Sequence, residues 1–408
     1  MPEPAPPTRW LSIVGIGEDG VEGLSPIARG LVAGADIVFG GERHLKLAAP
    51  LINGEAKRWP SPFSGAVGEV LALRGRQVCV LASGDPFFYG VGSLLANHVA
   101  PEETVVVPAP SAFSLAAARL GWALPDIALV SLHGRALDRI RPHLHPGARA
   151  LALTSDRDGP KALARLLDKI GFGASRLTVL EALGGARERV RSATAAQFDF
   201  GDVAELNIVA VEVEALPGAR VLAYTPGLAD DLFEHDGQIT KREIRAVTLA
   251  VLAPLRGEVL WDIGAGSGSV AIEWMLAHPS MRAITIEERA DRADRIRRNG
   301  AAFGVPELEV VEGRAPEVLA GLETPDAVFV GGGASGNGVL DAAIAALRPG
   351  GRLVVNAVTL ETEAELIARQ ASLGGTLTRI AVSRADSVGE KTAWRPALPV
   401  TQWVWVKP

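Results

Sequence analysis

The amino-acid sequence predicts an α/β protein with two unlike domains. Short apolar and β-branched runs alternate with stretches rich in Ala, Leu and Arg along all 408 residues, which predicts parallel sheets built from strand–helix–strand units. A glycine-rich turn follows an apolar run at Gly15, and another follows at Gly264. A chain of this length has room for two or three domains, each with its own apolar core.

The strands follow from β-branched and apolar runs between turn formers. In chain order we expect them at Leu11–Val14, Ile37–Phe39, Val78–Ala82, Thr104–Val107, Ala150–Leu153, Asn207–Val213, Glu258–Asp262, Ala283–Glu287, Glu309–Val311, Ala327–Val330 and Arg352–Val355. Trp403 and Trp405 alternate in QWVWV, which predicts a last strand with one packed face. Cys79 is expected to be a buried strand residue, and the alternating charges of residues 289–298 predict a helix with a solvated face.

A segment rich in Pro and Gly divides the chain. We expect a flexible N-terminus at residues 1–8, a first domain at 9–214, a linker at 215–225 and a second domain at 226–408. The two halves do not align with each other, so they are unlike domains and not an internal repeat.

Composition narrows the class of protein. No apolar run of about 18 residues lacks a charge or a turn former, so no membrane span is expected. One cysteine allows no internal disulfide or Cys-cluster zinc site, no group of residues has metal-ligand spacing, and the N-terminus does not resemble an export signal. A net charge of −6 argues against nucleic-acid binding. We expect a cytoplasmic homo-oligomeric enzyme without a metal.

The second half carries a spaced set of acids and glycines. An apolar strand ends at Asp262 and is followed by Gly264, Gly266 and Gly268, which is the D-x-G-x-G-x-G pattern of S-adenosylmethionine-dependent methyltransferases. The next strand ends at Glu287, where a carboxylate is placed to accept hydrogen bonds from ribose hydroxyls. The order of these elements favours a cofactor site over isolated tight turns.

Two other interpretations of this motif remain. The glycines alone are compatible with tight strand–helix turns of no further function. A nicotinamide dehydrogenase would need its third glycine three places after the second, which is not the spacing found. After the fourth strand the sequence reads Val330-Gly-Gly-Gly333, and small residues there suit a bulky planar acceptor whose nucleophile is a carbon.

Residues 225–408 resemble the C-terminal half of precorrin methyltransferases. The resemblance rests on Gly237–Arg245, on the glycine turn, on Gly313–Pro316, on Phe329–Gly332 and on Val354–Ala357. It implies a Rossmann-like sheet with helices on both faces. It also implies that S-adenosylmethionine contacts Thr240, Gly264, Ala265, Gly266, Ser267, Gly268, Glu287 and Ala315. Arg314 departs from the family, whose members usually have Asp there.

Residues 9–213 resemble the tetrapyrrole methylase family. The matching pieces include Val14–Gly17, Leu81–Gly90, Pro108–Ala112 and Ser131–Arg135. The family fold has two α/β subdomains with S-adenosylmethionine between them. The resemblance implies cofactor contacts at Gly15, Gly17, Gly84, Asp85, Ser111 and Ala112. Ala109 stands where the family usually has Gly.

His133 and Arg135 are the catalytic candidates of the first half. His133 is a candidate proton donor, with packing or hydrogen bonding as its alternative role. Arg135 is a candidate clamp for an acetate or propionate, since its planar fork binds carboxylates with two hydrogen bonds. Asp85 has an alternative role as a cap of the turn that Pro86 begins.

The fused order of the halves resembles the decarboxylating precorrin-6B (precorrin-6Y) C5,15-methyltransferase family of cobalamin biosynthesis. The resemblance implies one S-adenosylmethionine per domain and a tetrapyrrole substrate. The first domain would methylate C5, and the second would methylate C15 and decarboxylate the ring C acetate, giving precorrin-8X. Three alternatives remain: a methyltransferase acting on an earlier tetrapyrrole such as a uroporphyrinogen, a nicotinamide enzyme, and a non-catalytic tetrapyrrole carrier.

Overall fold

The computed structural model describes residues 9–408, so the predicted flexible terminus at residues 1–8 lies outside the described residues. The chain forms two compact units. The first runs to Leu137 and resumes at His145–Ala219, and the second contains Asp138–Leu144 and Arg220–Pro408. The division after Ala219 falls inside the segment that the sequence marks as a linker.

The first unit begins with a parallel sheet of five strands in the order β3-β2-β4-β1-β5. Its strands are β1 (Leu11–Ile16), β2 (Ile37–Gly40), β3 (Glu55–Arg58), β4 (Val78–Ser83) and β5 (Thr104–Val107), and its helices are α1 (Pro26–Ala33), α2 (Glu42–Ala48), α3 (Ala66–Leu71) and α4 (Val91–Leu95). Alternate residues of the central strands join two separate apolar clusters, one with α1 and α2 and one with α3 and α4. Helices therefore cover both faces, which is why β1 is buried along its whole length. Cys79 is fully buried in β4, as predicted.

The second sheet of this unit is mostly antiparallel. Its order is β6-β7-β10-β8-β9, and only β6 and β7 pair in parallel. The elements are β6 (Ala128–Ser131), β7 (Arg149–Leu153), β8 (Arg176–Glu181), β9 (Arg189–Thr194), β10 (Asn207–Glu212), α5 (Ala112–Leu120) and α6 (Gly159–Lys169). The expectation of parallel sheets throughout is wrong here. The short link between β8 and β9 allows a hairpin, whereas a parallel pair needs a long crossover.

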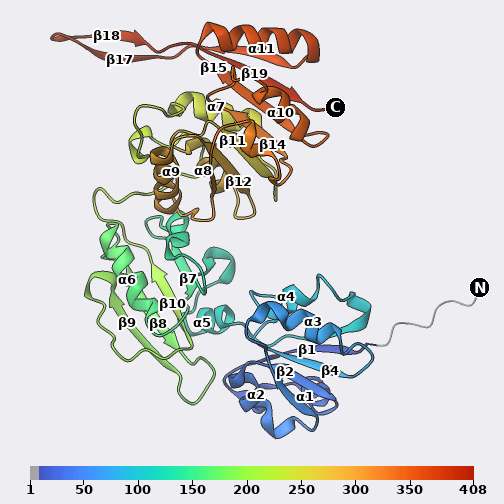
Figure 1. Ribbon diagram of the computed structural model, residues 1–408. Coiled ribbons are helices and arrows are strands. Elements are labelled where there is room, and N and C mark those ends of the chain that lie inside the picture. The colour runs from blue at the N-terminus through green and yellow to red at the C-terminus, as the bar shows by residue number, and fades with distance from the viewer. Residues whose placement is uncertain (1–8) are drawn as a thin grey trace, which may run out of the picture. The chain divides into compact units, whose positions relative to one another are not determined.

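The second unit contains one sheet of seven strands in the order β13-β12-β11-β14-β15-β19-β16 (Figure 1). Its strands are β11 (Val259–Ile263), β12 (Arg282–Glu287), β13 (Glu309–Glu312), β14 (Ala327–Val330), β15 (Arg352–Ala357), β16 (Thr376–Ile380) and β19 (Val400–Val406). The helices are α7 (Arg242–Leu252), α8 (Ser269–Leu276), α9 (Ala290–Ala302), α10 (Val339–Ala346) and α11 (Leu360–Leu373).

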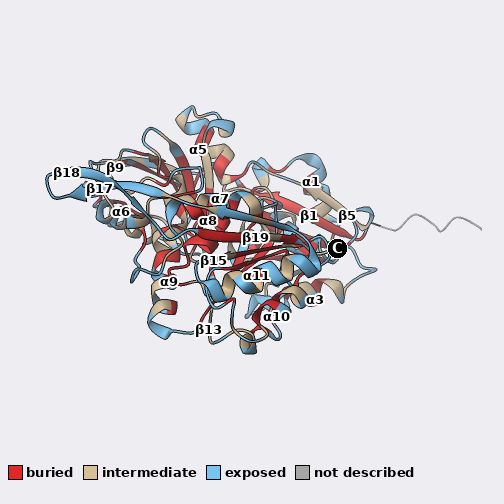
Figure 2. Cartoon of the chain, turned by 90° about the horizontal axis from the view of Figure 1, so that it is seen from above, coloured by how far each residue is buried: buried red, intermediate tan, exposed pale blue. Residues whose placement is uncertain are grey.

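Helices cover both faces of this sheet, which confirms the predicted Rossmann-like architecture. Residues of α7, α8 and α9 pack with one set of alternate strand residues, and residues of α10 and α11 pack with the other set. Figure 2 shows buried strands such as β15 and β19 beside the more exposed α11. Trp403 and Trp405 are buried in β19, and their indole N–H groups donate to the carbonyls of Gly374 and Leu373. The last strand is confirmed, and it runs antiparallel to β15. The expectation of one packed face is wrong, because Gln402, on the face opposite the two tryptophans, is 1% exposed.

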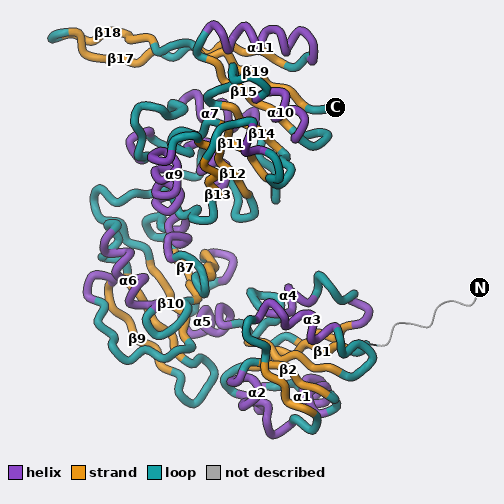
Figure 3. The backbone as a smooth tube through the Cα atoms, in the orientation of Figure 1, coloured by secondary structure: helices purple, strands orange, loops and turns teal. Residues whose placement is uncertain are grey.

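A two-stranded hairpin extends from this sheet. It consists of β17 (Ser383–Val388) and β18 (Lys391–Pro396), and every residue of both strands is exposed. Figure 3 shows the two strands running side by side away from α11.

Candidate functional site

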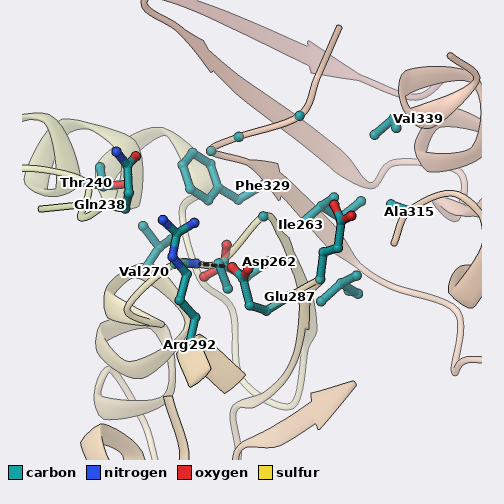
Figure 4. Close-up of a pocket in the computed structure, with 18 of the residues that line it drawn as sticks. Gln238, Thr240, Asp262, Ile263, Val270, Glu287, Arg292, Ala315, Phe329 and Val339 are labelled. Atoms are coloured by element: carbon teal, nitrogen blue, oxygen red, sulfur yellow. Dashed lines mark hydrogen bonds between the residues drawn. The ribbon is translucent and has the colours of Figure 1, made fainter. Parts of the chain in front are cut away.

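The second unit holds a cavity of about 640 Å³ at the carboxyl ends of β11, β12 and β14. This is the edge of an open α/β sheet where ligands bind in general. The segment before α7 also contributes, since Gln238 and Thr240 line the cavity. Figure 4 shows these two residues on the opposite side from Ala315 and Val339, with Asp262 and Glu287 between them.

The glycine turn after β11 brings three stretches of backbone close together. Gly264 has a φ of +71°, and a Cβ there would lie 2.6 Å from the carbonyl oxygen of Gly332. A Cβ on Gly266, whose φ is +60°, would lie 3.0 Å from the carbonyl oxygen of Gln238. Only glycine fits such positions without strain and collision, so the turn forms a cradle with no side chains over its backbone.

Two acids lie beneath this cradle. The Glu287 carboxylate accepts hydrogen bonds from the backbone N–H of Gly266 at 2.9 Å and of Arg289 at 3.1 Å. Asp262 is buried, and its Oδ2 accepts a bond from the N–H of Ala271 at 3.2 Å. Its Oδ1 is buried without a hydrogen-bond partner among the described residues. Burial raises the pKa of Asp262 to about 7, the N–H of Ala271 lowers it, and the charge of Glu287 raises it further.

A buried ion pair holds the segment before α7. Arg245 and Glu273 are almost completely buried and meet at 2.7 Å. Arg245 also donates to the carbonyl oxygen of Thr240 at 2.5 Å. Glu273 accepts the backbone N–H groups of Gly227 and Leu228 at 2.6 and 3.0 Å. The pair therefore fixes both the entry to α7 and the position of Thr240 at the cavity.

Six of the residues predicted for this site line the cavity: Thr240, Gly264, Ala265, Gly266, Glu287 and Ala315. Ser267 and Gly268 do not. Ser267 is fully buried, and a Cβ on Gly268 would meet Ile296 of α9 at 2.8 Å, so this glycine lets helix and turn pack closely. Sequence reasoning did not single out Gln238, Arg292, Phe329 or Val339 as lining residues. Gln238 and Phe329 lie inside segments that carry the family resemblance, but only the fold brings Arg292 of α9 to the cavity.

These residues fit S-adenosylmethionine by the chemistry of their donors and acceptors. A buried acid with an unpartnered oxygen suits an ammonium group. Glu287 suits ribose hydroxyls, because a carboxylate has several acceptor sites beyond the two backbone N–H groups. Phe329 and Ile263 supply apolar surface at the same cavity.

The first unit holds a cavity of about 540 Å³ lined by residues of both of its sheets. The strand ends of β1 and β4 contribute Gly17 and Gly84, and the start of α5 contributes Ser111 and Ala112. Ser111 caps α5, since its Oγ accepts the N–H of Ser114 at 3.1 Å. These four predicted residues are brought together.

Gly15 and Asp85 do not line this cavity. A Cβ on Gly15 would lie 1.9 Å from the carbonyl oxygen of Gly84, so this glycine lets two strand ends approach each other. The same carbonyl accepts the N–H of Ala109 at 3.1 Å, so the backbone approaches closely there even with alanine. Asp85 accepts the N–H of Phe87 at 2.8 Å, which is the turn-capping alternative.

A polar cluster at this cavity was not predicted from the sequence. Arg43 forms an ion pair with Glu18 and donates to Ser83 Oγ at 2.8 Å, and His44 Nε2 lies 2.7 Å from the same hydroxyl. Burial and the positive charge of Arg43 lower the pKa of His44 to about 4. Arg43 and His44 lie on α2, and nothing in their local sequence indicates that they meet the ends of β1 and β4.

Arg135 lines a neighbouring cavity of about 730 Å³ with the exposed rings of Phe87 and Tyr89. Its guanidinium lies 5.9 Å from the centre of the Tyr89 ring. Tyr89 has a φ of +59°, a strained value for a residue with a side chain, and such strain gathers at functional sites. His133 lines both this cavity and the one of about 540 Å³.

Residues 9–408 offer neither a cluster of metal ligands nor a membrane-spanning helix. They form no group of three or more His, Cys, Asp or Glu side chains that could hold a metal ion. Among the same residues no helix is both long and apolar enough to cross a membrane.

Comparisons with known proteins place both parts of the chain in known families. Residues 11–199 match the tetrapyrrole (corrin/porphyrin) methylases, and residues 231–407 match the precorrin methyltransferase domain. A Sinorhizobium protein named precorrin-6Y C(5,15)-methyltransferase (decarboxylating) is 61% identical over 99% of this chain and 98% of its own length.

Two shorter relatives match only part of the chain. A cobalt-precorrin-7 C(5)-methyltransferase of Salmonella typhimurium is 32% identical over 48% of this chain and 98% of its own length. A probable cobalt-precorrin-6B C(15)-methyltransferase (decarboxylating) of Saccharolobus solfataricus is 35% identical over 36% of this chain and 78% of its own length. Because the chain is 61% identical to the Sinorhizobium protein over nearly the full length of both, it belongs to the decarboxylating precorrin-6Y C(5,15)-methyltransferase family, whose members are S-adenosylmethionine-dependent methyltransferases.

Proposed function

We propose that this chain methylates precorrin-6B at C5 and C15 and removes the ring C acetate carboxyl as carbon dioxide, giving precorrin-8X. The observation that carries the proposal is the presence of a separate cofactor-sized cavity in each of the two units, in a chain with the family's two domains in the family's order.

Each unit would hold one S-adenosylmethionine, which supplies an electrophilic methyl group when bound. In the second unit Asp262 would accept the ammonium group, Glu287 the ribose hydroxyls, and the Gly264–Gly266 backbone would lie along the ligand. In the first unit Gly17, Gly84, Ser111 and Ala112 would line the ligand, with much of the contact made by loop backbone. The fit in the second unit rests on the unpartnered, buried Oδ1 of Asp262.

The side chains of both cavities would bind the methyl donor and the tetrapyrrole and orient them toward each other. Holding a carbon nucleophile in line with a methyl group supplies up to about 7–11 kcal/mol of the barrier as orientation. The Arg245–Glu273 pair positions Thr240, and the glycines admit ligand against backbone without a side chain between them. Arg135, beside Phe87 and Tyr89, would bind a carboxylate at the edge of a planar macrocycle. A guanidinium pairs with carboxylates through two hydrogen bonds and stacks on aromatic faces.

The two shorter relatives support a division of the work. Their names assign C5 methylation to one separate protein and C15 methylation with decarboxylation to another. We therefore assign C5 to the first unit and C15 with the decarboxylation to the second. Cytoplasmic location, a homo-oligomeric state and the absence of nucleic-acid binding stay predictions, to be tested by fractionation, sedimentation and electrophoretic shift.

Incubation with precorrin-6B and S-adenosylmethionine, followed by mass spectrometry, tests the proposal. The product should carry two additional methyl groups and lack one carbon dioxide. A product that gains methyl groups without losing carbon dioxide would contradict the decarboxylation. Turnover of a uroporphyrinogen in place of precorrin-6B would favour a methyltransferase of an earlier tetrapyrrole. Hydride transfer would show a nicotinamide enzyme, and binding without turnover a carrier.

A further inference from the structure

We infer that Nε2 of His133 accepts the proton that leaves C5 when the first unit methylates the tetrapyrrole. The inference rests on the proposed function. A ring carbon that bears hydrogen gains a methyl group through a new carbon–carbon bond, and the carbon–sulfur bond of the donor breaks. The carbon–hydrogen bond must then break too, with its electron pair returning to the conjugated ring. The proton therefore needs an acceptor.

The carboxylates that line the first unit's cavity are poor acceptors. Glu18 is ion-paired with Arg43, and Glu205 accepts two hydrogen bonds from Arg157 at 2.8 and 2.5 Å. Protonating either carboxylate would leave an arginine without its counter-charge. An arginine therefore already occupies each of these carboxylates.

His44 is also excluded as the acceptor. Its Nε2 lies 2.9 Å from Nη2 of Arg43, which can only donate, so Nε2 already accepts a hydrogen bond. A proton on this nitrogen would face the guanidinium at that distance and would lose the hydrogen bond. The pKa of His44 is lowered to about 4, chiefly by burial and further by the charge of Arg43.

His133 has the opposite arrangement. Its Nδ1 lies 3.3 Å from the carbonyl oxygen of Thr154, and a carbonyl only accepts, so Nδ1 carries the proton of the neutral ring. Nε2 is then the unprotonated nitrogen, and among the described residues the ring's hydrogen bond is the one made at Nδ1, so Nε2 is left open. The loop that carries His133 is held in place as well, because the N–H of Gly134 donates to Ser155 Oγ at 2.9 Å.

His133 also occupies a suitable place. It lines both the cavity assigned to the cofactor and the neighbouring one with Phe87, Tyr89 and Arg135, which would take the macrocycle. A group shared by the two cavities lies where methyl donor and ring carbon meet. Of the ionisable side chains lining these cavities, that of His133 alone combines a free acceptor nitrogen with this position.

His133→Asn in the full chain tests the inference. The amide N–H₂ can still donate to Thr154, whereas no basic nitrogen remains. His98→Asn is the matched control, since His98 is exposed and lines neither cavity. Both variants and the unaltered chain are given precorrin-6B, unlabelled or deuterated at C5, together with S-adenosylmethionine.

The expected result is a product of His133→Asn that is decarboxylated and methylated at C15 but not at C5. The rate of C5 methylation should fall by about 100-fold or more, as for loss of a general base. Its residual reaction should show a larger deuterium isotope effect than the unaltered chain, which a structural role would not produce.

Three results would overturn the inference. These are C5 methylation by His133→Asn at the rate of the His98→Asn control, an unchanged isotope effect, and an equal loss of both methylations. Failure of the unaltered chain to methylate precorrin-6B at all would overturn the proposed function and this inference with it. The C15 product therefore separates the two kinds of failure.

Discussion

The carboxylate of Glu287 at the end of β12 accepts the backbone N–H of Gly266 at 2.9 Å. This bond joins the end of β12 to the glycine turn that follows β11. The carboxylate that would accept hydrogen bonds from ribose hydroxyls therefore also shapes the glycine cradle. It can do both because a carboxylate offers about four acceptor sites.

Glu287→Ala should weaken binding of S-adenosylhomocysteine to the second unit by about 1–3 kcal/mol, because ribose donors and the Gly266 N–H lose a charged acceptor. Titration calorimetry of the full chain with S-adenosylhomocysteine should show two binding phases. In Glu287→Ala the affinity of one of them should fall. Glu390→Ala removes a charge from the exposed hairpin and should leave both phases unchanged. Two unaltered phases in Glu287→Ala would show that this acid does not contact the ligand.

Asp262→Asn should stabilise the ligand-free chain, and more so as pH rises. The folded-state pKa of Asp262 is about 7, above its ordinary value of 3.8, so folding favours the protonated form. Between these values the folded state binds more protons than the unfolded state, so this group makes stability fall with rising pH. The resulting loss in the free energy of unfolding reaches about 4 kcal/mol at most, and it is complete above the pKa that Asp262 has in the folded state.

Urea unfolding of Asp262→Asn and of the unaltered chain at several pH values checks this prediction. The difference between the two proteins should be small near pH 4, grow up to about pH 7 and stay constant above it. A difference independent of pH would mean that Asp262 is already ionised in the folded chain.

Arg245→Met should destabilise the second unit by about 3–5 kcal/mol, because it leaves the charge of Glu273 buried without its partner. Chemical denaturation measures this cost. The double variant Arg245→Met/Glu273→Gln should be more stable than the single variant, since the uncompensated charge is gone. If the double variant is the less stable of the two, the pair is not electrostatically coupled.

Gly264→Ala should abolish ligand binding to the second unit, because its Cβ would lie 2.6 Å from a backbone oxygen. Gly257→Ala is the matched control. Gly257 also has a positive φ, +87°, but a Cβ there meets no atom within 4 Å. The control should carry only the strain of a left-handed alanine, about 1–2 kcal/mol. Equal affinity in the two variants would contradict the close approach of the turn to Gly332.

The sequence predicted most of the fold because buried strands are continuous apolar runs. Leu11, Val78 and Ala327 each begin a strand where one was expected. The prediction failed where a strand or its pairing partner depends on contacts between segments far apart in the sequence. The partly buried β9 and the exposed β17 and β18 carry no apolar alternation, and the antiparallel order of the second sheet depends on which strands meet. The strand β8 was not expected either, although five of its six residues are buried.

The candidate sites divide in the same way. Glycines and acids at strand ends were predictable, since parallel strands bring their carboxyl ends to one edge. Glycine spacing alone did not separate Gly264, which lines a cavity, from Gly15 and Gly268, which do not. At all three positions a Cβ would come too close to other atoms. Arg43 and His44 were missed because their partners Glu18 and Ser83 come from other elements.

The central claim is that one chain holds two independent S-adenosylmethionine sites. Titration calorimetry of the full chain with S-adenosylhomocysteine tests it most directly. The account predicts two molecules bound per chain, and one molecule bound at unchanged affinity in Gly264→Ala. A stoichiometry of one per unaltered chain would contradict it.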